Sequence, residues 1–379
     1  MQTIILHNPN KLVFGAGCFN QFVDDLKSLG KRRLYILTIP LLKEQVRQKL
    51  DLLAEFGITF LINDELNSEP GFSHFYRFMK EALAFKPDAI IGIGGGSVLD
   101  VAKLLAALID NEQKLEEVVG IGLLKKRSLY LACLPTTSGT GSEVSPNAIL
   151  LDETDGMKKG IISPCLVPDT AYVDPLLTMG MPAGITASTG MDALTHCLEA
   201  YTNKFAHPMV DLYALEGIRL ISKSLAKACA NDLQARTDVS LGSLYGGMCL
   251  GPVNTTAVHA LSYPLGSEFK IAHGLANAIL LPDVMEYNLV ADPERFAPVA
   301  QALGAEEKAS AKETALEGVA VVRKLMKQCG LPSKLSEIGI PEQAIPEMAR
   351  SAVKIQRLMK NNIREISVDD AISIYQKVY

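Results

Sequence analysis

The sequence has 379 residues, which is too long for one ordinary hydrophobic core and predicts two domains. Apolar residues make up 48%, charged residues 21%, and the formal net charge is −5. These values are typical of a soluble globular protein. The acidic balance and the absence of any long Lys/Arg run exclude an overall basic nucleic-acid-binding protein.

Membrane and export signals are also missing from the sequence. No apolar run reaches the roughly 18 residues that a membrane-spanning helix needs. The N-terminal stretch MQTIILHNPNKLVFG lacks the basic start and long apolar segment of a signal peptide. Seven cysteines, an odd number with no CxxC pair, indicate reduced thiols. We therefore expect a cytoplasmic protein that binds neither membranes nor nucleic acid.

Strand and helix patterns alternate along the first half of the chain. The expected strands lie at 32–38, 57–63, 88–97 and 128–137, and helical patterns between them occupy 43–56 and 72–85. Alternation of this kind predicts a parallel sheet whose faces are covered by helices.

The pattern changes near residue 183. From there on the sequence contains helical segments separated by glycines and prolines, with no convincing strand. We therefore predict an α/β dinucleotide-binding domain over 1–182, followed by an all-helical domain over 183–379. A cleft between two such domains is a common place for a ligand.

Two glycine clusters follow predicted strands. In IIGIGGGSVLDVAK (90–103), Gly94, Gly95, Gly96 and Ser97 stand between a strand and a helix, where backbone N–H groups can approach a phosphate. The spacing is not GxGxxG, and a glycine-rich turn without a ligand is the alternative.

The second cluster, LPTTSGTGSEVSPNAIL (134–150), places Thr136, Thr137 and Ser142 beside glycines. Such hydroxyl groups can donate to phosphate, ribose or carboxamide groups. The alternative is a polar turn. Two loops of this type at the ends of strands favour a ligand, because open α/β sheets bind ligands at that edge.

The helical half contains a candidate metal site. Asp192 and His196 are four residues apart and share one apolar helix face, where burying a charge is costly unless it is paired. His259 and His273 also lie in apolar surroundings. Three imidazoles and one carboxylate suit a divalent first-row metal that keeps an open position. For each histidine alone, a satisfied core position is the alternative.

The motifs KLVFGAG, GGGSVLDVAK, PTTSGTGSEVS, TGMDALTHCLEAY and HALSYPLG…AHGLANAILLP together resemble the iron-dependent (group III) alcohol dehydrogenases over essentially the whole chain. The resemblance implies the fold that this family shares with dehydroquinate synthase. It also implies that Asp192, His196, His259 and His273 hold one Fe²⁺ or Zn²⁺, which acts as a Lewis acid on the substrate oxygen.

The resemblance further implies a nicotinamide cofactor. Gly95, Gly96 and Ser97 match the family's phosphate loop, and we assign Asp100 of the same motif to the cofactor as well. The residues matched to the nicotinamide side and to the cofactor and substrate cleft are Thr136, Thr137, Ser142, Asn147 and Lys158. Lys158 is in addition a candidate catalytic residue.

Two positions depart from the family pattern. Many members have a second histidine four residues after the third ligand, where this chain has Tyr263. Tyr263 is a candidate proton relay or a packing residue, and hydroxyacid–oxoacid transhydrogenases resemble this form. Where NAD-preferring members often have an aspartate that bonds the ribose, this chain has Ile39, so both NAD and NADP remain open.

The function implied is reversible hydride transfer between NAD(P)(H) and a small alcohol, aldehyde or ketone, in a homodimer or higher homo-oligomer. An edge strand near residues 1–14 would suit pairing across a dimer. The alternatives are a hydroxyacid–oxoacid type or glycerol/polyol-type dehydrogenase, a metal-dependent lyase resembling dehydroquinate synthase, and a non-catalytic binding module.

Overall fold

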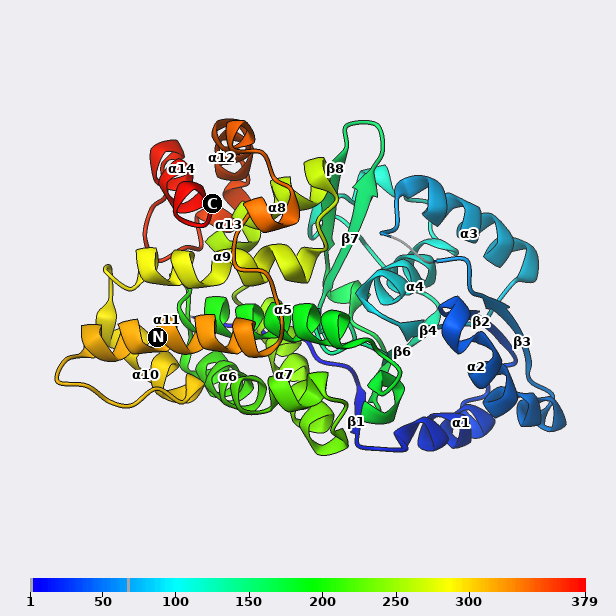
Figure 1. Ribbon diagram of the computed structural model, residues 1–379. Coiled ribbons are helices and arrows are strands. Elements are labelled where there is room, and N and C mark those ends of the chain that lie inside the picture. Colours follow the sequence, from blue (N-terminus) through cyan, green and yellow to red (C-terminus); the bar gives the residue numbers. More distant parts are fainter. Residues whose placement is uncertain (1–2, 67–68) are drawn as a thin grey trace. The chain divides into compact units, whose positions relative to one another are not determined.

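The computed structural model describes residues 3–66 and 69–379, which fall into two compact units (Figure 1). One unit consists of His7–Thr137 and Ser142–Thr178 and contains the strands. The other consists of Met179–Tyr379 with two short segments, the described residues up to Leu6 and the loop 138–141. The predicted division at residues 182 and 183 as a functional domain boundary stays a prediction.

The first unit is an α/β unit built around a parallel sheet. Its sheet has the order β1-β9-β6-β4-β2-β3, and every described pair in it is parallel. The six strands are β1 (Lys11–Phe14), β2 (Arg33–Leu37), β3 (Thr59–Asn63), β4 (Ala89–Gly94), β6 (Tyr130–Pro135) and β9 (Thr170–Val173). The α-helices between them are α1 (Cys18–Ser28), α2 (Lys43–Leu50), α3 (Phe72–Phe85) and α4 (Gly96–Leu108).

Both faces of this sheet are buried, as the continuous apolar strands predict. Along β2, Leu34 and Ile36 pack on one face with helices α1 and α2, whereas Tyr35 and Leu37 pack on the other with α3 and α4. Each fully buried apolar side chain stabilises the fold by about 1.5–3 kcal/mol relative to exposure. The alternation of side chains therefore fixes the three layers.

The strand order reverses between β2 and β4. The chain runs from β2 outward to β3 and then returns to β4 on the other side of β2. The C-terminal ends of β2 and β4 are thus neighbours. Thr38 follows β2, and the glycine run 94–96 begins with the last residue of β4. In open α/β sheets this reversal point is where ligands bind.

One expected helix is shorter than predicted. The pattern at 43–56 forms α2 only up to Leu50 and continues as a 3₁₀ segment, η2 (Asp51–Phe56). Gly57 ends the segment at φ 68°, and its N–H bonds to Ala54, three residues back. The tighter i to i+3 hydrogen bonds of a terminal turn explain the difference.

A second, three-stranded sheet in this unit was not predicted. It has the order β5-β8-β7, in which β7 (Asn147–Asp152) and β8 (Met157–Ile162) form an antiparallel hairpin beside the short β5 (Gly120–Ile121). Gly156, at φ 68° in the turn, and the β-type residues on both sides are the signals that identify this hairpin.

The start of α1 is held by a buried carboxylate. Asp174 accepts hydrogen bonds from the backbone N–H groups of Gly17 (2.9 Å), Phe19 (3.0 Å) and Leu176 (3.0 Å). We expect Asp174→Ala to lower the free energy of unfolding by about 2 kcal/mol, because it leaves these donors without their acceptor. Denaturant unfolding measures the change. The exposed Asp24→Ala should change it by less than about 0.5 kcal/mol, and equal effects would contradict the role of Asp174.

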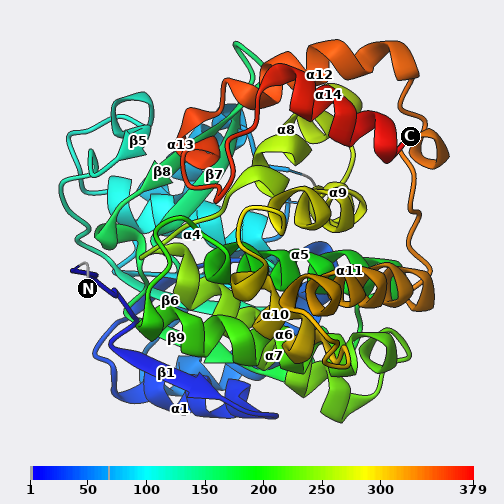
Figure 2. The same cartoon turned by 90° about the vertical axis from the view of Figure 1, so that its left-hand side faces the viewer.

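The second unit is helical. Its longest elements pack around α5, as Figures 1 and 2 show, with α6, α7 and α9 in direct contact with it. Its α-helices are α5 (Ala183–Tyr201), α6 (Pro208–Cys229), α7 (Leu233–Leu250), α8 (Ala257–Phe269), α9 (His273–Asn288), α10 (Pro293–Leu303), α11 (Ala311–Gln328), α12 (Ile345–Val353), α13 (Gln356–Met359) and α14 (Val368–Lys377).

The central helix α5 is buried on nearly all sides from Gly190 to Tyr201. A helix surrounded in this way belongs to the core, so its polar residues must find partners inside the protein. The predicted fold class, a parallel α/β part followed by a helical part, is confirmed. Among the described helices none is long and apolar enough to cross a membrane, and all seven cysteines are free thiols.

Candidate metal centre and cofactor loops

The helix α5 carries two predicted ligands on one buried stripe. Asp192 and His196 are 3% and 5% exposed, and Asp192 Oδ1 lies 3.9 Å from His196 Nε2. The i, i+4 spacing places both side chains on the same face, as expected.

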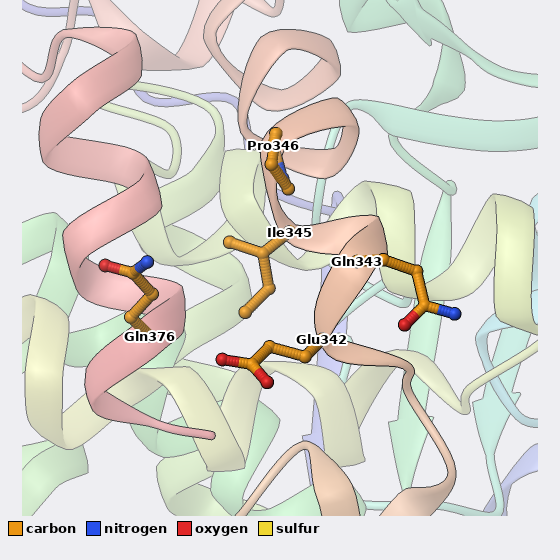
Figure 3. Close-up of a pocket in the computed structure, with 5 residues that line it drawn as sticks. All are labelled: Glu342, Gln343, Ile345, Pro346 and Gln376. Carbon is orange, nitrogen blue, oxygen red and sulfur yellow. The ribbon is translucent and has the colours of Figure 1, made fainter.

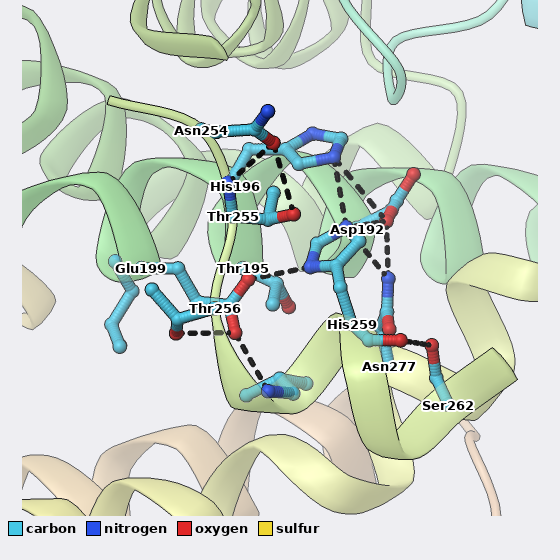
Figure 4. A network of polar contacts seen from close by, with 12 residues as sticks. Asp192, Thr195, His196, Glu199, Asn254, Thr255, Thr256, His259, Ser262 and Asn277 are labelled. Atoms are coloured by element: carbon cyan, nitrogen blue, oxygen red, sulfur yellow. Dashed lines mark hydrogen bonds and ion pairs between the residues drawn. The ribbon is translucent and has the colours of Figure 1, made fainter. Parts of the chain in front are cut away.

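Helices α8 and α9 bring the other two histidines to this stripe. Asp192 Oδ1 lies 3.6 Å from His259 Nε2 and 3.7 Å from His273 Nε2. Ligand atoms of Asp192, His196 and His259 all lie within 4.8 Å of one another, and Figure 4 shows these three side chains turned toward each other. His273, at the start of α9, is the more exposed member, at 32% of its side chain. All four predicted residues are therefore brought together.

A second buried carboxylate, Glu199, supports the cluster and was not identified from the sequence. Glu199 Oε2 lies 2.5 Å from His259 Nδ1, and Oε1 accepts from Thr256 Oγ1 (2.8 Å) and Val258 N (2.7 Å). It therefore fixes both the imidazole ring and the start of α8. Its position seven residues after Asp192, on the same helical stripe, is the signal that could have found it.

The Nδ1 atoms of His196 and His259 each have a hydrogen-bond partner, and the Nε2 atoms of the two rings face each other. Gly139 O can only accept, so His196 Nδ1, 3.2 Å away, carries the hydrogen. The Glu199 carboxylate likewise accepts from His259 Nδ1. The two Nε2 atoms are only 3.0 Å apart, and two lone pairs at that distance repel. The arrangement requires a positive charge at this point, either a proton or a metal cation.

The electrostatics of the cluster agree with this requirement. Burial lowers the pKa of His259, but the Glu199 and Asp192 carboxylates outweigh burial and raise the pKa to about 10. Burial lowers the pKa of His196. Burial opposes ionisation of Asp192, yet the three imidazoles hold its pKa well below the usual range. The cluster thus attracts cationic charge.

Asn277 of α9 completes the cluster and was also missed. Its Nδ2 lies 2.7 Å from Asp192 Oδ1, 3.2 Å from His259 Nε2 and 3.3 Å from His273 Nε2. Its Oδ1 is buried and has no hydrogen-bond partner among the described residues. An unbonded oxygen beside four ligand-type side chains fits a site built for a cation.

Part of the second glycine cluster belongs to the helical unit. Ser138 Oγ lies 2.8 Å from Ser240 Oγ, and Gly139 O contacts His196. Gly141, at φ 59°, lies so close to α7 that a Cβ atom would come within 2.3 Å of Gly247 Cα. This glycine therefore serves close packing of the loop.

The first glycine cluster forms the turn from β4 into α4. Gly94 ends β4 and Gly95 caps α4, whose first turn contains Gly96 and Ser97. A Cβ at Gly94 would lie 2.6 Å from Val98, so only glycine lets the helix start this close to the strand. The exposed helix N-terminus after a buried parallel strand is the geometry that binds phosphate groups.

Asp100 and Ser142 are bonded to each other. Asp100 Oδ1 accepts from Ser142 Oγ (2.6 Å), and Oδ2 accepts from Ile149 N (2.9 Å). Lys103, fully buried on the same helix, donates to the carbonyl oxygens of Ser145 and Asn147, both at 2.9 Å. Its role was not recognised from the sequence. These contacts hold the hydroxyl loop and the start of β7 against α4.

Burial also shifts the pKa values of the ionisable side chains around the start of β7. Burial lowers the pKa of Lys103 and raises that of Asp100. The pKa of Glu143, buried nearby, rises to about 7 for the same reason.

Two buried oxygens of the α/β unit are left without hydrogen-bond partners in the described ranges. They are Asn147 Oδ1, at the start of β7, and Thr38 Oγ1, at the end of β2. Ile39 follows Thr38 and packs against the core on the side of α3 and α4. An unbonded hydroxyl at the end of a parallel strand, as at Thr38, fits the recognition of a polar cofactor.

The two candidate catalytic residues lie in different units. Lys158 of β8 forms an ion pair with Glu69, with Nζ 2.5 Å from Oε1. Tyr263 of α8 has its ring centroid 6.0 Å from that of His273, and its hydroxyl oxygen accepts a hydrogen bond of 2.7 Å from Arg357.

A separate pocket of about 320 Å³ lies beside α12 and α14. Figure 3 shows the lining residues Glu342, Gln343, Ile345, Pro346 and Gln376. Only one of them is ionisable, and none belongs to the cluster around Asp192. This pocket has no set of groups suited to catalysis, and we assign it no role.

Comparison with known proteins gives consistent results along the whole chain. Residues 9–175 match the family model described as iron-containing alcohol dehydrogenase, and residues 186–379 match that of the C-terminal part of the Fe-containing alcohol dehydrogenase family. The chain is 37% identical over 373 residues to long-chain-alcohol dehydrogenase 1 of Geobacillus thermodenitrificans (strain NG80-2), covering 96% of this chain and 94% of that protein.

Two further relatives cover nearly all of the chain. It is 33% identical to sulfoacetaldehyde reductase of Bilophila wadsworthia (strain 3_1_6), covering 98% of this chain and 97% of that protein. The solved structure of 1,3-propanediol oxidoreductase superposes with a TM-score of 0.95 at 32% identity, covering 100% of both chains. With both halves matched and the buried Asp–His cluster in place, the chain belongs to the iron-containing alcohol dehydrogenase family.

Proposed function

We propose that the protein catalyses reversible hydride transfer between NAD(P)(H) and a small alcohol, aldehyde or ketone at a divalent metal. The observation that carries this proposal is the buried cluster in which Asp192, His196 and His259 converge within 4.8 Å. Family membership fixes the reaction class as that of an alcohol dehydrogenase or aldehyde reductase.

The metal would be Fe²⁺, or Zn²⁺, held by Asp192, His196, His259 and His273. When bound, it would polarise the substrate carbonyl and stabilise the negative charge that develops on oxygen. The protein keeps the ligands ready for it: Glu199 orients His259, and the Gly139 carbonyl orients His196. Such supporting contacts are typical of metal-binding histidines.

The cofactor would be NAD or NADP, which supplies the hydride. Its phosphates would lie at Gly94, Gly95, Gly96 and Ser97, where α4 begins. The hydroxyl loop with Thr136, Thr137 and Ser142, together with Asn147, would bind the nicotinamide side. Asp100 accepts from Ser142 and Ile149 N, so its proposed part in cofactor binding is to position this loop.

Tyr263 is the proposed proton relay. Its oxygen accepts from Arg357, which orients the hydroxyl and leaves its hydrogen available for the substrate oxygen or water. Lys158 is the second candidate catalytic residue. The variants Tyr263→Phe and Lys158→Met test the two candidates separately. The variant that removes the proton relay should lower kcat and change the dependence of kcat on pH.

The test of the proposed function is metal-dependent cofactor oxidation. The protein is stripped of metal and reloaded anaerobically with Fe²⁺ or Zn²⁺. Oxidation of NADH and NADPH is then followed with short aldehydes, ketones and oxoacids. We expect turnover that returns only on reloading. Stoichiometric metal without turnover across the panel would instead favour a lyase or a non-catalytic protein, and turnover confined to polyols would favour the glycerol-type dehydrogenases.

Ile39, the second residue after β2, provides a test of cofactor choice. We expect Ile39→Asp to lower kcat/KM with NADPH by about 10-fold relative to NADH, because a carboxylate there would repel a 2′-phosphate. Ile39→Asn is the matched control without charge and should leave the ratio nearly unchanged. If Asp and Asn shift the ratio equally, Ile39 does not lie near the ribose.

We further propose a cytoplasmic homodimer or higher homo-oligomer. Seven free thiols suit a reducing compartment. The strand β1 stands at one end of the sheet order, where an unpaired edge can meet a second copy. Light scattering tests the assembly, and a monomeric mass would reject it.

A further inference from the structure

The residue that takes the place of the second histidine is contacted by an arginine. Tyr263 lies one helical turn after His259 on α8, and its ring is 6.0 Å from that of His273, measured between centroids. The Arg357 guanidinium, on α13, donates from Nη2 to the Tyr263 hydroxyl oxygen at 2.7 Å. Its Cζ lies 5.5 Å from the ring centroid of Tyr263. A positive charge therefore lies two contacts away from the candidate metal ligands.

Arg357 has no carboxylate partner in the described part of the chain. Arg295 and the exposed Arg323 of this unit pair with Asp211 and Asp283, respectively. The partly buried Arg364 donates instead to the carbonyl oxygen of Tyr287. A guanidinium group has five N–H donors in a planar fork, and one donor suffices for Tyr263. Burying such a charge without a counter-charge is costly, so an unpaired arginine beside an active site indicates an anionic ligand.

The position of Arg357 is fixed by its surroundings. The helix α13 packs against α8 (Figure 2). Its residues Leu358 and Met359 are buried in the core. Asn361 donates to Thr255 O (3.0 Å), two residues before α8, and to Arg357 O (3.2 Å). A binding group that is held in place loses less freedom when it binds its ligand.

From these contacts we infer that Arg357, oriented through Tyr263, binds an oxyanion group of the substrate. This inference rests on the proposed function, because it assigns the substrate class of that same site. The substrate would be a short aldehyde or ketone with a carboxylate or a sulfonate at its other end. The carbonyl would face the Asp192 cluster, and the anion would accept charge-assisted hydrogen bonds from the free edge of Arg357.

The first experiment compares anionic and neutral aldehydes of matched length. Reduction of 4-oxobutanoate is measured against butanal, and that of sulfoacetaldehyde against propanal, with the metal-reloaded protein. We expect kcat/KM to favour at least one anionic member by about 10-fold or more, and the two pairs distinguish carboxylate from sulfonate. Arg357→Met should raise KM for the anion so that its kcat/KM advantage over the neutral aldehyde falls by about 10-fold or more. Any loss of kcat from a misoriented Tyr263 should be shared by both substrates.

Two further variants control for the charge and for the fold. Arg357→Lys keeps the positive charge but not the planar fork of N–H donors. It should therefore retain part of the preference for the anionic aldehyde that Arg357→Met loses. Arg350→Met removes an exposed arginine of the neighbouring α12 that pairs with Glu347, and should change neither substrate. Equal use of neutral and anionic aldehydes by the natural protein, or parallel losses with both in Arg357→Met, would overturn the inference.

Equilibrium binding separates this inference from the proposed function. Butanoate and ethanesulfonate carry the anion but no carbonyl, so calorimetry can follow their binding whether or not the protein turns over. We expect Arg357→Met to raise the Kd of at least one of them by about 10-fold or more. Unchanged affinities, or no detectable binding to the natural protein, would reject the anion site. Tight binding without turnover in any assay would retain the anion site and reject the oxidoreductase reaction.

Discussion

Replacing His259 with alanine is expected to remove the bound metal and to lower kcat/KM for aldehyde reduction by more than about 100-fold. His259 is buried, its Nε2 lies 3.6 Å from Asp192 Oδ1, and its Nδ1 contacts Glu199. The substitution removes one of four donors and leaves the Glu199 carboxylate without its imidazole partner. Loss of an outer contact alone costs metal sites roughly 10- to 100-fold, so loss of a ligand should exceed that range.

Metal content and rate must fall together for this prediction to hold. Metal per chain is measured by elemental analysis after anaerobic reloading, and rates are measured on the same samples. The matched control is His7→Ala, since His7 is an exposed histidine of the other unit. A His259→Ala protein that turns over at the natural rate would show that the cluster is not the reaction centre.

The second large effect is expected at Glu199, which contacts no substrate and holds His259 in place. In Glu199→Gln one carboxylate oxygen becomes an amide NH₂. If that NH₂ faces His259, it donates to Nδ1 and forces the hydrogen onto Nε2, which then cannot bind a metal. If the amide turns round, its NH₂ faces Thr256 and the N–H of Val258. We therefore expect metal affinity to fall about 10- to 100-fold while the fold is kept.

Competition with a chelator measures this affinity directly. Because the ligands themselves remain, high metal concentration should restore most of the rate, which distinguishes Glu199→Gln from His259→Ala. Glu216→Gln, at a partly exposed glutamate paired with Arg219 on α6, should leave the affinity unchanged. An unaltered affinity in Glu199→Gln would mean that the carboxylate does not orient the ring.

The fold class and the metal cluster could be predicted because they depend on local patterns. Continuous apolar strands such as β4 require two covered faces, and the spacing of Asp192 and His196 places both on one helix face. The membership of the iron-containing alcohol dehydrogenase family, predicted from the motifs, is confirmed by the matches to both halves.

The contacts that support the site could not be predicted in the same way. Glu199 lies on the same helical stripe as Asp192, but its partner His259 is on another helix, and Asn277 is on a third. Only the packing of α5, α8 and α9 brings these groups together. Lys103 is a single cation at the end of a short motif, yet it is fully buried against the carbonyl oxygens of Ser145 and Asn147. Arg357 lies 94 residues from Tyr263, and no local spacing relates the two.

The most direct measurement is a titration of stripped protein with Fe²⁺ under anaerobic conditions, with the rate of NADH or NADPH oxidation recorded at each step. A single reaction centre formed by Asp192, His196, His259 and His273 predicts that the rate rises in proportion to added metal and stops rising at one Fe²⁺ per chain. Full activity in the stripped protein, or a rate that ignores the metal added, would contradict a metal-dependent reaction at this cluster.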